Sequence, residues 1–201
     1  MKKLMILTML TLIVLSATQA QARRSVKDDE VDKVRIPFKE ADTGIEMRKI
    51  RRVGIGAQAA GALGMGGMIL DLNMSPKWSF TTGFGGGEGF QSYMFQAKYV
   101  LSGDWLMPYL GFGFTHWASM GKTGRITRTN PSILNEKLLN DDEKAAGEYR
   151  KNMFFPSIGL QFMQLKGAWA GSAVFAEITV LFDVGNFVAA PTGTVGLAYY
   201  F

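Results

Sequence analysis

His116 is the only histidine in the chain, and Ser119 follows it three residues later. An imidazole can take the proton of a serine hydroxyl, so this pair could support acyl transfer or hydrolysis. The alternative is that His116 is a polar residue with no catalytic role. With a single imidazole and no cysteine thiolate, the sequence predicts neither a metal site nor thiol catalysis.

Two glycine-rich stretches share part of their spacing with nucleotide-binding motifs. Gly54, Gly56 and Ala59 fit the pattern G-x-G-x-x-A, and Asp71 follows at a distance suited to a ribose ligand. That motif needs a helix after its glycines, but further glycines at 61, 64, 66 and 67 would interrupt one. The stretch 83–89 lacks the Gly-Lys-Ser/Thr that ends a phosphate loop. We therefore expect no nucleotide and no other cofactor.

Isolated polar residues interrupt several stretches in which every second residue is apolar. Asp71 lies between Leu70 and Leu72, and the same period of two places a single charge among apolar neighbours elsewhere. In a strand, such a residue faces the side opposite to the apolar residues. The pattern predicts a polar network on one face, which either cements the interior or lines a narrow passage. Its members are Asp71, Lys98, Glu177, Gln58, Gln96 and Gln161.

The elements that would position these residues are β-strands. From Arg51 to Phe201 the chain is rich in glycine and aromatic residues and alternates with a period of two, broken by turn residues. Each run is long enough for the roughly 9 to 11 residues of a tilted membrane strand. We predict strands at 51–62, 66–74, 77–86, 90–101, 105–118, 152–165, 168–182 and 187–201.

The positions of charged residues within the predicted strands test whether one face of each strand can face lipid. A lysine or arginine facing lipid at mid-membrane costs roughly 2 to 4 kcal/mol. If the apolar residues on either side of Asp71, Lys98 and Glu177 face lipid, all three charges face inward. The tryptophans lie near strand ends, as in an interfacial belt, although the alternation points two of them, Trp117 and Trp169, inward. Three prolines within strands, Pro108, Pro156 and Pro191, would each forfeit a ladder hydrogen bond.

The N-terminus has the layout of a secretory signal peptide. Lys2 and Lys3 precede an apolar stretch from Leu4 to Leu15, and the small-residue motif Ala20-Gln21-Ala22 follows. We predict a signal peptide at 1–22 and a flexible, charged extension at 23–50. Without Lys2 and Lys3 the chain keeps 20 basic and 17 acidic residues, a net charge of +3. So small an imbalance gives no reason to expect nucleic acid as a partner.

The C-terminal strand carries a family resemblance. Val195, Leu197, Tyr199 and Phe201 alternate with small or polar residues, and the chain ends on the aromatic residue. Together with the strand from Pro108 to Gly113 and the signal peptide, this run resembles the small outer-membrane barrels of the OmpA, OmpX and OmpW class. The resemblance implies an all-β fold, a closed antiparallel eight-stranded transmembrane barrel over 51–201 in the outer membrane of a Gram-negative bacterium. It also implies that the terminal run is an assembly signal for the barrel assembly machinery.

A long connection separates the fifth and sixth predicted strands. The segment 119–150 begins with basic residues, Lys122, Arg125 and Arg128, and then places Ile133, Leu134, Leu138 and Leu139 at helical spacing. On an outer-membrane barrel the basic part could contact lipopolysaccharide phosphates, while the helical part packs over the barrel mouth. A solvated loop is the alternative.

A barrel of this class does not by itself assign a function. We expect a non-enzymatic protein in contact with outer-membrane lipids and lipopolysaccharide, with a structural or surface role. The resemblance to OmpW would also allow a narrow pore for small or hydrophobic solutes. One alternative is a lipid A-modifying enzyme that uses His116, because lipid A deacylases use a histidine and a serine on a comparable barrel. Another is an adhesin or binding protein that acts through 119–150.

Overall fold

The structure is a computed structural model that describes residues 41–121 and 126–201. The predicted signal peptide, most of the predicted extension, and two of the basic residues of the long connection, Lys122 and Arg125, lie outside the described residues. Within the described ranges no helix is both long enough and apolar enough to cross a bilayer.

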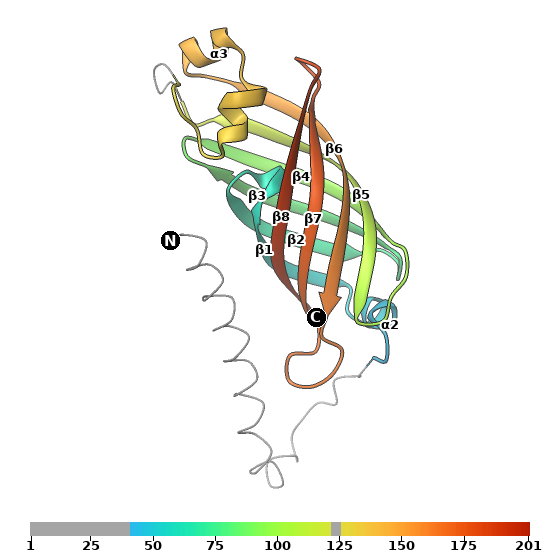
Figure 1. The fold of residues 1–201 in the computed structure, drawn as a ribbon. Helices are drawn as coiled ribbons and strands as arrows, with labels where there is room; N and C mark the ends of the chain where they lie inside the picture. The colour runs from blue at the N-terminus through green and yellow to red at the C-terminus, as the bar shows by residue number, and fades with distance from the viewer. Residues whose placement is uncertain (1–40, 122–125) are drawn as a thin grey trace, which may run out of the picture. The chain divides into compact units, whose positions relative to one another are not determined.

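Eight antiparallel strands form a closed barrel, in which each strand pairs with the next and β1 pairs with β8 (Figure 1). The predicted fold class is therefore confirmed. We call the end at which β1 begins and β8 ends the base, and the opposite end the rim. The strands are β1 Val53–Ala60, β2 Gly66–Asn73, β3 Trp78–Gly87, β4 Phe90–Val100, β5 Leu106–Ser119, β6 Arg150–Met163, β7 Ser172–Asp183 and β8 Val188–Tyr200.

The alternation of side chains follows the prediction along most of the wall. In β6, each residue from Lys151 to Met163 alternates between buried and exposed. The exposed members include Phe154, Ile158 and Leu160, so an apolar surface faces outward. Because the strand repeat is two residues, the intervening side chains must fill the interior.

The beginning of β7 differs most from the predicted strand. We expected it at 168, but β7 begins at Ser172 because a turn occupies the preceding residues. Gly167 and Gly171 both have positive φ angles, a conformation that glycine adopts without steric cost. Trp169 lies in this turn and is exposed, which explains why the strand alternation wrongly pointed it inward.

The residues before β1 form a helix, α2 Gly44–Ile50, which the sequence did not predict. Thr43 caps it by accepting a hydrogen bond from the Glu46 amide. Met47 and Arg48 are buried against the base, and the Gly44 amide donates to the Asp104 carbonyl. The expectation of a flexible extension up to residue 50 is therefore wrong for the helix, which uses its short apolar face to cover the base (Figure 1).

The first rim connection folds into the barrel. Its 3-10 turn, η2 Gly61–Leu63, is fully buried, although we predicted its first residues as strand. Ala60 and Gly61 both have positive φ angles, which turn the chain away from the wall and inward. At the same end, the long connection contains a π-helix, η3 Leu134–Leu138, and a short helix, α3 Asp141–Ala146 (Figure 1).

The inward turn at Ala60 leaves part of β8 unpaired. Ala60 pairs with Thr194, but residues 188–193 of β8 pair only with β7. Odd-numbered residues of β8 direct their backbone groups toward β1, as the bond from the Phe201 amide to the Val53 carbonyl shows. Pro191 is odd-numbered, so its backbone nitrogen faces the side of β8 that is unpaired at residues 188–193. The lack of an N–H at this position therefore costs no ladder bond. We had expected a cost there because a closed barrel should have no edge.

Candidate functional site

The six predicted polar residues all lie in the barrel interior, between 2% and 7% exposed. They come from β1, β2, β4, β6 and β7, so most of the barrel wall contributes to the set. We call these residues, with the hydroxyl groups that bond to them, the polar layer. Its predicted members are Gln58, Asp71, Gln96, Lys98, Gln161 and Glu177.

One half of the polar layer is organised around Asp71. The Tyr200 hydroxyl donates to Asp71 Oδ2 at 2.6 Å, and Thr81 Oγ1 donates to Asp71 Oδ1 at 3.1 Å. Gln161 Nε2 donates to the Tyr200 hydroxyl at 3.2 Å. These bonds satisfy both carboxylate oxygens and connect β2, β3, β6 and β8 across the interior. Tyr200 was not among the predicted site residues, although it faces opposite to the terminal apolar run and so could have been found by the alternation.

The other half is organised around Glu177. Gln96 Nε2 donates to Glu177 Oε2 at 2.7 Å and to Ser157 Oγ at 3.0 Å, while Thr179 Oγ1 donates to Glu177 Oε1 at 2.9 Å. A carboxylate that accepts hydrogen bonds on both oxygens is stabilised in a low-dielectric interior. The bonds tie β4 to β6 and β7.

Lys98 and Gln58 contribute weaker contacts. The Lys98 ammonium lies 5.4 Å from the ring centre of Tyr109 and 5.0 Å from that of Phe175, so two aromatic faces stabilise its charge. Gln58 Nε2 lies 3.9 Å from the Met94 sulfur. These contacts hold the side chains in the layer with little directional bonding.

Apolar clusters close the interior on both sides of the polar layer. At the rim, fully buried side chains from the wall, from η2 and from η3 pack together, among them Leu63, Phe90, Trp117, Leu134 and Phe155. At the base, α2 contributes Met47 to a second cluster with Val100, Met107, Met163 and Tyr200. Small barrels of eight strands have interiors that side chains nearly fill, and this one follows that rule.

Hydrogen bonds hold η2 inside the rim. Trp117 Nε1 and Thr115 Oγ1 donate to the Ala62 carbonyl at 2.8 and 2.6 Å, and Ser92 Oγ donates to the Leu63 carbonyl at 2.8 Å. Trp117 is fully buried, so its assignment to an interfacial belt is wrong and the alternation was right. Its indole needs a partner when buried, and the inward turn supplies a carbonyl.

A buried ion-pair cluster fastens the long connection to the rim. Lys151 Nζ lies 2.8 Å from Glu143 Oε2 and 3.1 Å from Asp183 Oδ2. The side chains of Lys151 and Asp183 are 4% and 2% exposed. Glu143 also completes a capping box with Asn140 at the start of α3. Sequence reasoning missed this cluster. Continuing the alternation of β6 from Met153 back by two residues would have placed Lys151 inside the barrel.

Arginine side chains fasten the base. Arg51 Nη1 donates to the Ala170 carbonyl at 2.7 Å and to the Tyr200 carbonyl at 2.8 Å. Arg48 Nε donates to the Pro76 carbonyl at 3.0 Å. Both arginines therefore bind backbone carbonyls of the turns at the base, and Arg51 also binds the carbonyl of the last residue of β8.

The geometry does not bring His116 and Ser119 together as a catalytic pair. The two residues have opposite parity on β5, so their side chains project on opposite sides of the wall. His116 Nδ1 lies 2.7 Å from Asn152 Oδ1, and its ring stacks on Tyr93. Ser119 Oγ accepts a hydrogen bond from the Tyr149 amide. His116 is thus a cross-strand partner on the outer face.

The remaining predicted site residues that the structure describes lie on the surface. Arg128, the described member of the basic set, is exposed. The terminal run of Val195, Leu197, Tyr199 and Phe201 projects outward and is exposed. Neither group takes part in the polar layer.

Comparison with solved structures places the barrel among known folds. The N-terminal β-barrel domain of Pseudomonas aeruginosa OprF matches with a TM-score of 0.52 at 14% identity, over 75% of this chain and 98% of that domain. The fold is that of a small outer-membrane barrel. Acinetobacter baumannii CarO and CarO2 were also matched, at 12% and 14% identity, over 76% and 75% of this chain and 99% of theirs, with TM-scores of 0.38 and 0.34. No family model and no curated protein matched the chain.

Proposed function

We propose that this chain is an integral outer-membrane protein with a non-enzymatic, structural role, and that its barrel is closed to solutes at rest. The observation that carries this proposal is the sealing of the interior. Two apolar clusters lie on either side of a hydrogen-bonded polar layer, so a hydrated path would have to displace buried side chains at both ends.

The outward surface supports a location in the membrane. Large apolar residues that would be costly to expose to water cover the wall, among them Met68, Phe84, Phe112, Ile158 and Ile178. The OprF barrel domain has the same fold. The predicted signal peptide would export the chain, and the terminal run ending in Phe201 would engage the barrel assembly machinery.

The long connection supports a second role at the cell surface. Because the Lys151 cluster and the rim cluster hold η3 and α3 in place, these two helices would present a fixed surface to a partner. We propose that Arg128, with Lys122 and Arg125, contacts lipopolysaccharide phosphates, which match guanidinium and ammonium groups in charge and geometry.

Planar-bilayer recording tests the closed state. We expect the refolded protein to insert without producing conductance steps, because the apolar clusters exclude water and ions. A general porin reconstituted in the same way serves as the positive control, and heat-modifiable gel migration verifies folding. Reproducible steps from the folded wild-type protein would contradict the closed barrel and support the narrow pore.

A further inference from the structure

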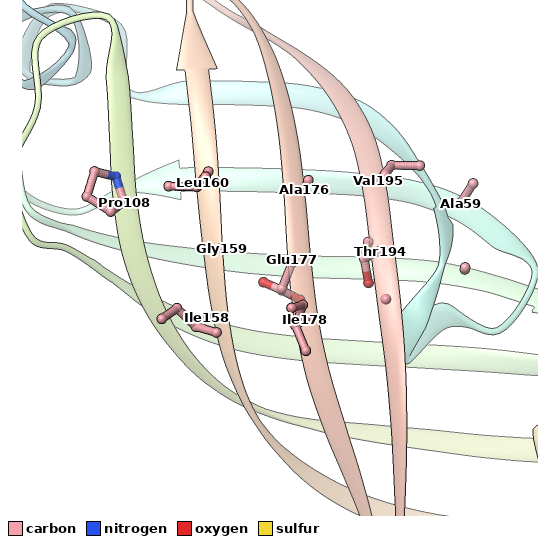
Figure 2. A pocket seen from close by; sticks show the side chains of 12 residues that line it. Ala59, Pro108, Ile158, Gly159, Leu160, Ala176, Glu177, Ile178, Thr194 and Val195 are labelled. Carbon is pink, nitrogen blue, oxygen red and sulfur yellow. The ribbon is translucent and has the colours of Figure 1, made fainter. Parts of the chain in front are cut away.

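A narrow apolar groove crosses the outer face of the barrel, with a volume of about 640 Å³. Its floor follows one rung of the sheet, in which Ala60 pairs with Thr194, Thr194 with Glu177, and Glu177 with Gly159. The Glu177 and Thr194 side chains are buried in the interior, so only their backbones contribute to the floor. Figure 2 shows the lining residues on neighbouring strands.

Small residues create the groove between larger ones. Ile158 and Ile178 form the wall toward the rim, and Leu160 and Val195 form the wall toward the base. Ala176 lies in the base-side row between Leu160 and Val195, and Gly193 lies in the rim-side row beside Ile178, so each wall is low at one point. A Cβ atom added at Gly193 would meet only the Glu177 carbonyl, at 3.7 Å, so the position is open toward the groove.

The groove runs obliquely between the two ends of the barrel. Ala60 is the last residue of β1, at the rim, whereas Pro108 is the third residue of β5, near the base. Its lining comes from five neighbouring strands, which span roughly 19 Å at about 4.8 Å per strand. That length is about two thirds of the roughly 30 Å hydrocarbon core of a bilayer.

Residues suited to a membrane interface lie at the base end. Trp105 directly precedes β5 and is 57% exposed, and Trp169 in the β6–β7 turn is 71% exposed. Trp105 packs edge-on against Phe162. Lys166, in the same turn as Trp169, is also exposed. Tryptophan and lysine at this level are typical neighbours of lipid head groups.

From this geometry we propose that the groove binds one acyl chain of a phospholipid from the leaflet at the base, with its head group near Trp105 and Trp169. The inference rests on the membrane location proposed above. A second barrel is a poorer occupant, because its convex wall cannot enter a groove one rung wide. An acyl chain has the required width, and it needs none of the polar groups that the lining lacks. In lipid its retention comes from shape and dispersion contacts.

Native mass spectrometry of the full refolded protein tests the site. Protein is reconstituted into vesicles of phosphatidylethanolamine and phosphatidylglycerol, then released in mild detergent, and the retained lipid is counted. The filled variant is Gly193→Leu with Ala176→Leu. The matched control is Ala57→Leu with Ala189→Leu, at outward-facing positions on β1 and β8 outside the groove. Circular dichroism and heat-modifiable migration check that each variant folds, and Gly193→Val alone replaces the filled variant if it does not.

We expect the wild type and the control to retain one phospholipid, and the filled variant to retain about tenfold less. Equal retention in all three proteins would overturn the proposal. A dimer lost only in the filled variant, with lipid unchanged, would also overturn it and would assign the groove to a second copy. Failure of the wild type to enter vesicles would refute the membrane location itself, whereas insertion without retained lipid would refute the groove alone.

Discussion

At the scale of single residues, Lys151 shows how burial changes the value of an ion pair. Its ammonium bridges Glu143 of α3 and Asp183 of β7 with almost no solvent contact. Lys144 and Asp141 also form a pair, at 3.7 Å, but the Asp141 side chain is fully exposed. Removing one partner of a buried pair leaves an uncompensated charge, while an exposed pair contributes little.

We therefore expect Lys151→Met to destabilise the rim by about 3 to 5 kcal/mol, because it leaves Asp183 buried without its cation. Limited proteolysis of the segment 126–146 measures the effect as faster cleavage. Lys144→Met is the matched control and should change cleavage little. Equal cleavage rates for the two variants would show that the Lys151 cluster does not hold the connection.

At the scale of elements, the three prolines differ although their sequence signal is the same. Pro191 faces the unpaired edge of β8, and Pro108 lies near the start of β5. Pro156 lies in the middle of β6, where the pairs with β7 stop at Phe154 and resume at Ser157. Pro108 lies opposite Leu101, whose amide donates to the Pro108 carbonyl, so its missing N–H costs a bond only where the ladder with β4 ends, whereas Pro156 interrupts a ladder in mid-strand.

This difference predicts a stability ranking for the same substitution at two positions, because both variants lose about 0.4 to 1 kcal/mol through the freer unfolded chain but only Pro156→Ala gains a mid-strand ladder bond. Pro156→Ala supplies an N–H toward β7, and a ladder bond is worth about 0.5 to 1.5 kcal/mol. Pro191→Ala supplies an N–H toward the edge without a partner strand, so nothing offsets its loss. We expect Pro156→Ala to be the more stable variant in urea unfolding from detergent micelles. The reverse order would mean that the β8 edge is paired in solution.

At the scale of the whole molecule, closure depends on the seam between β1 and β8. The Phe201 amide donates to the Val53 carbonyl at 2.9 Å, beyond the last residue of β8. One bond among the many of the ladder contributes little to the stability of the finished barrel. The assembly signal that we propose at this terminus, in contrast, would act before the barrel closes.

Deletion of Phe201 separates these two roles. We expect the shortened chain to refold in detergent with unchanged heat-modifiable migration, since the seam loses one bond. In cells, we expect less of it in the outer-membrane fraction, because the terminal aromatic residue is the proposed signal for assembly. A Phe201→Tyr chain, which keeps an aromatic terminus, is the control. Normal cellular assembly of the shortened chain would remove the signal role from Phe201.

The sequence by itself determined which face of each strand points outward. A period of two and the cost of placing Asp71, Lys98 or Glu177 in hydrocarbon leave one arrangement, and the structure has it. The same rule correctly turned Trp117 inward. The strand count also follows from local signals, because turns interrupt the alternation wherever a strand ends.

Only the tertiary structure decided which residues meet across the interior. Tyr200 reaches Asp71 from 129 positions away in the sequence, and Gln96 reaches Glu177 from 81. Such contacts depend on the stagger of the strands around the barrel, which alternation within one strand does not encode. The inward turn of η2 and the docking of α2 could not be predicted from the sequence either, because their apolar surfaces are too short to form a periodic pattern. Both elements are stabilised only by the barrel ends that they cover.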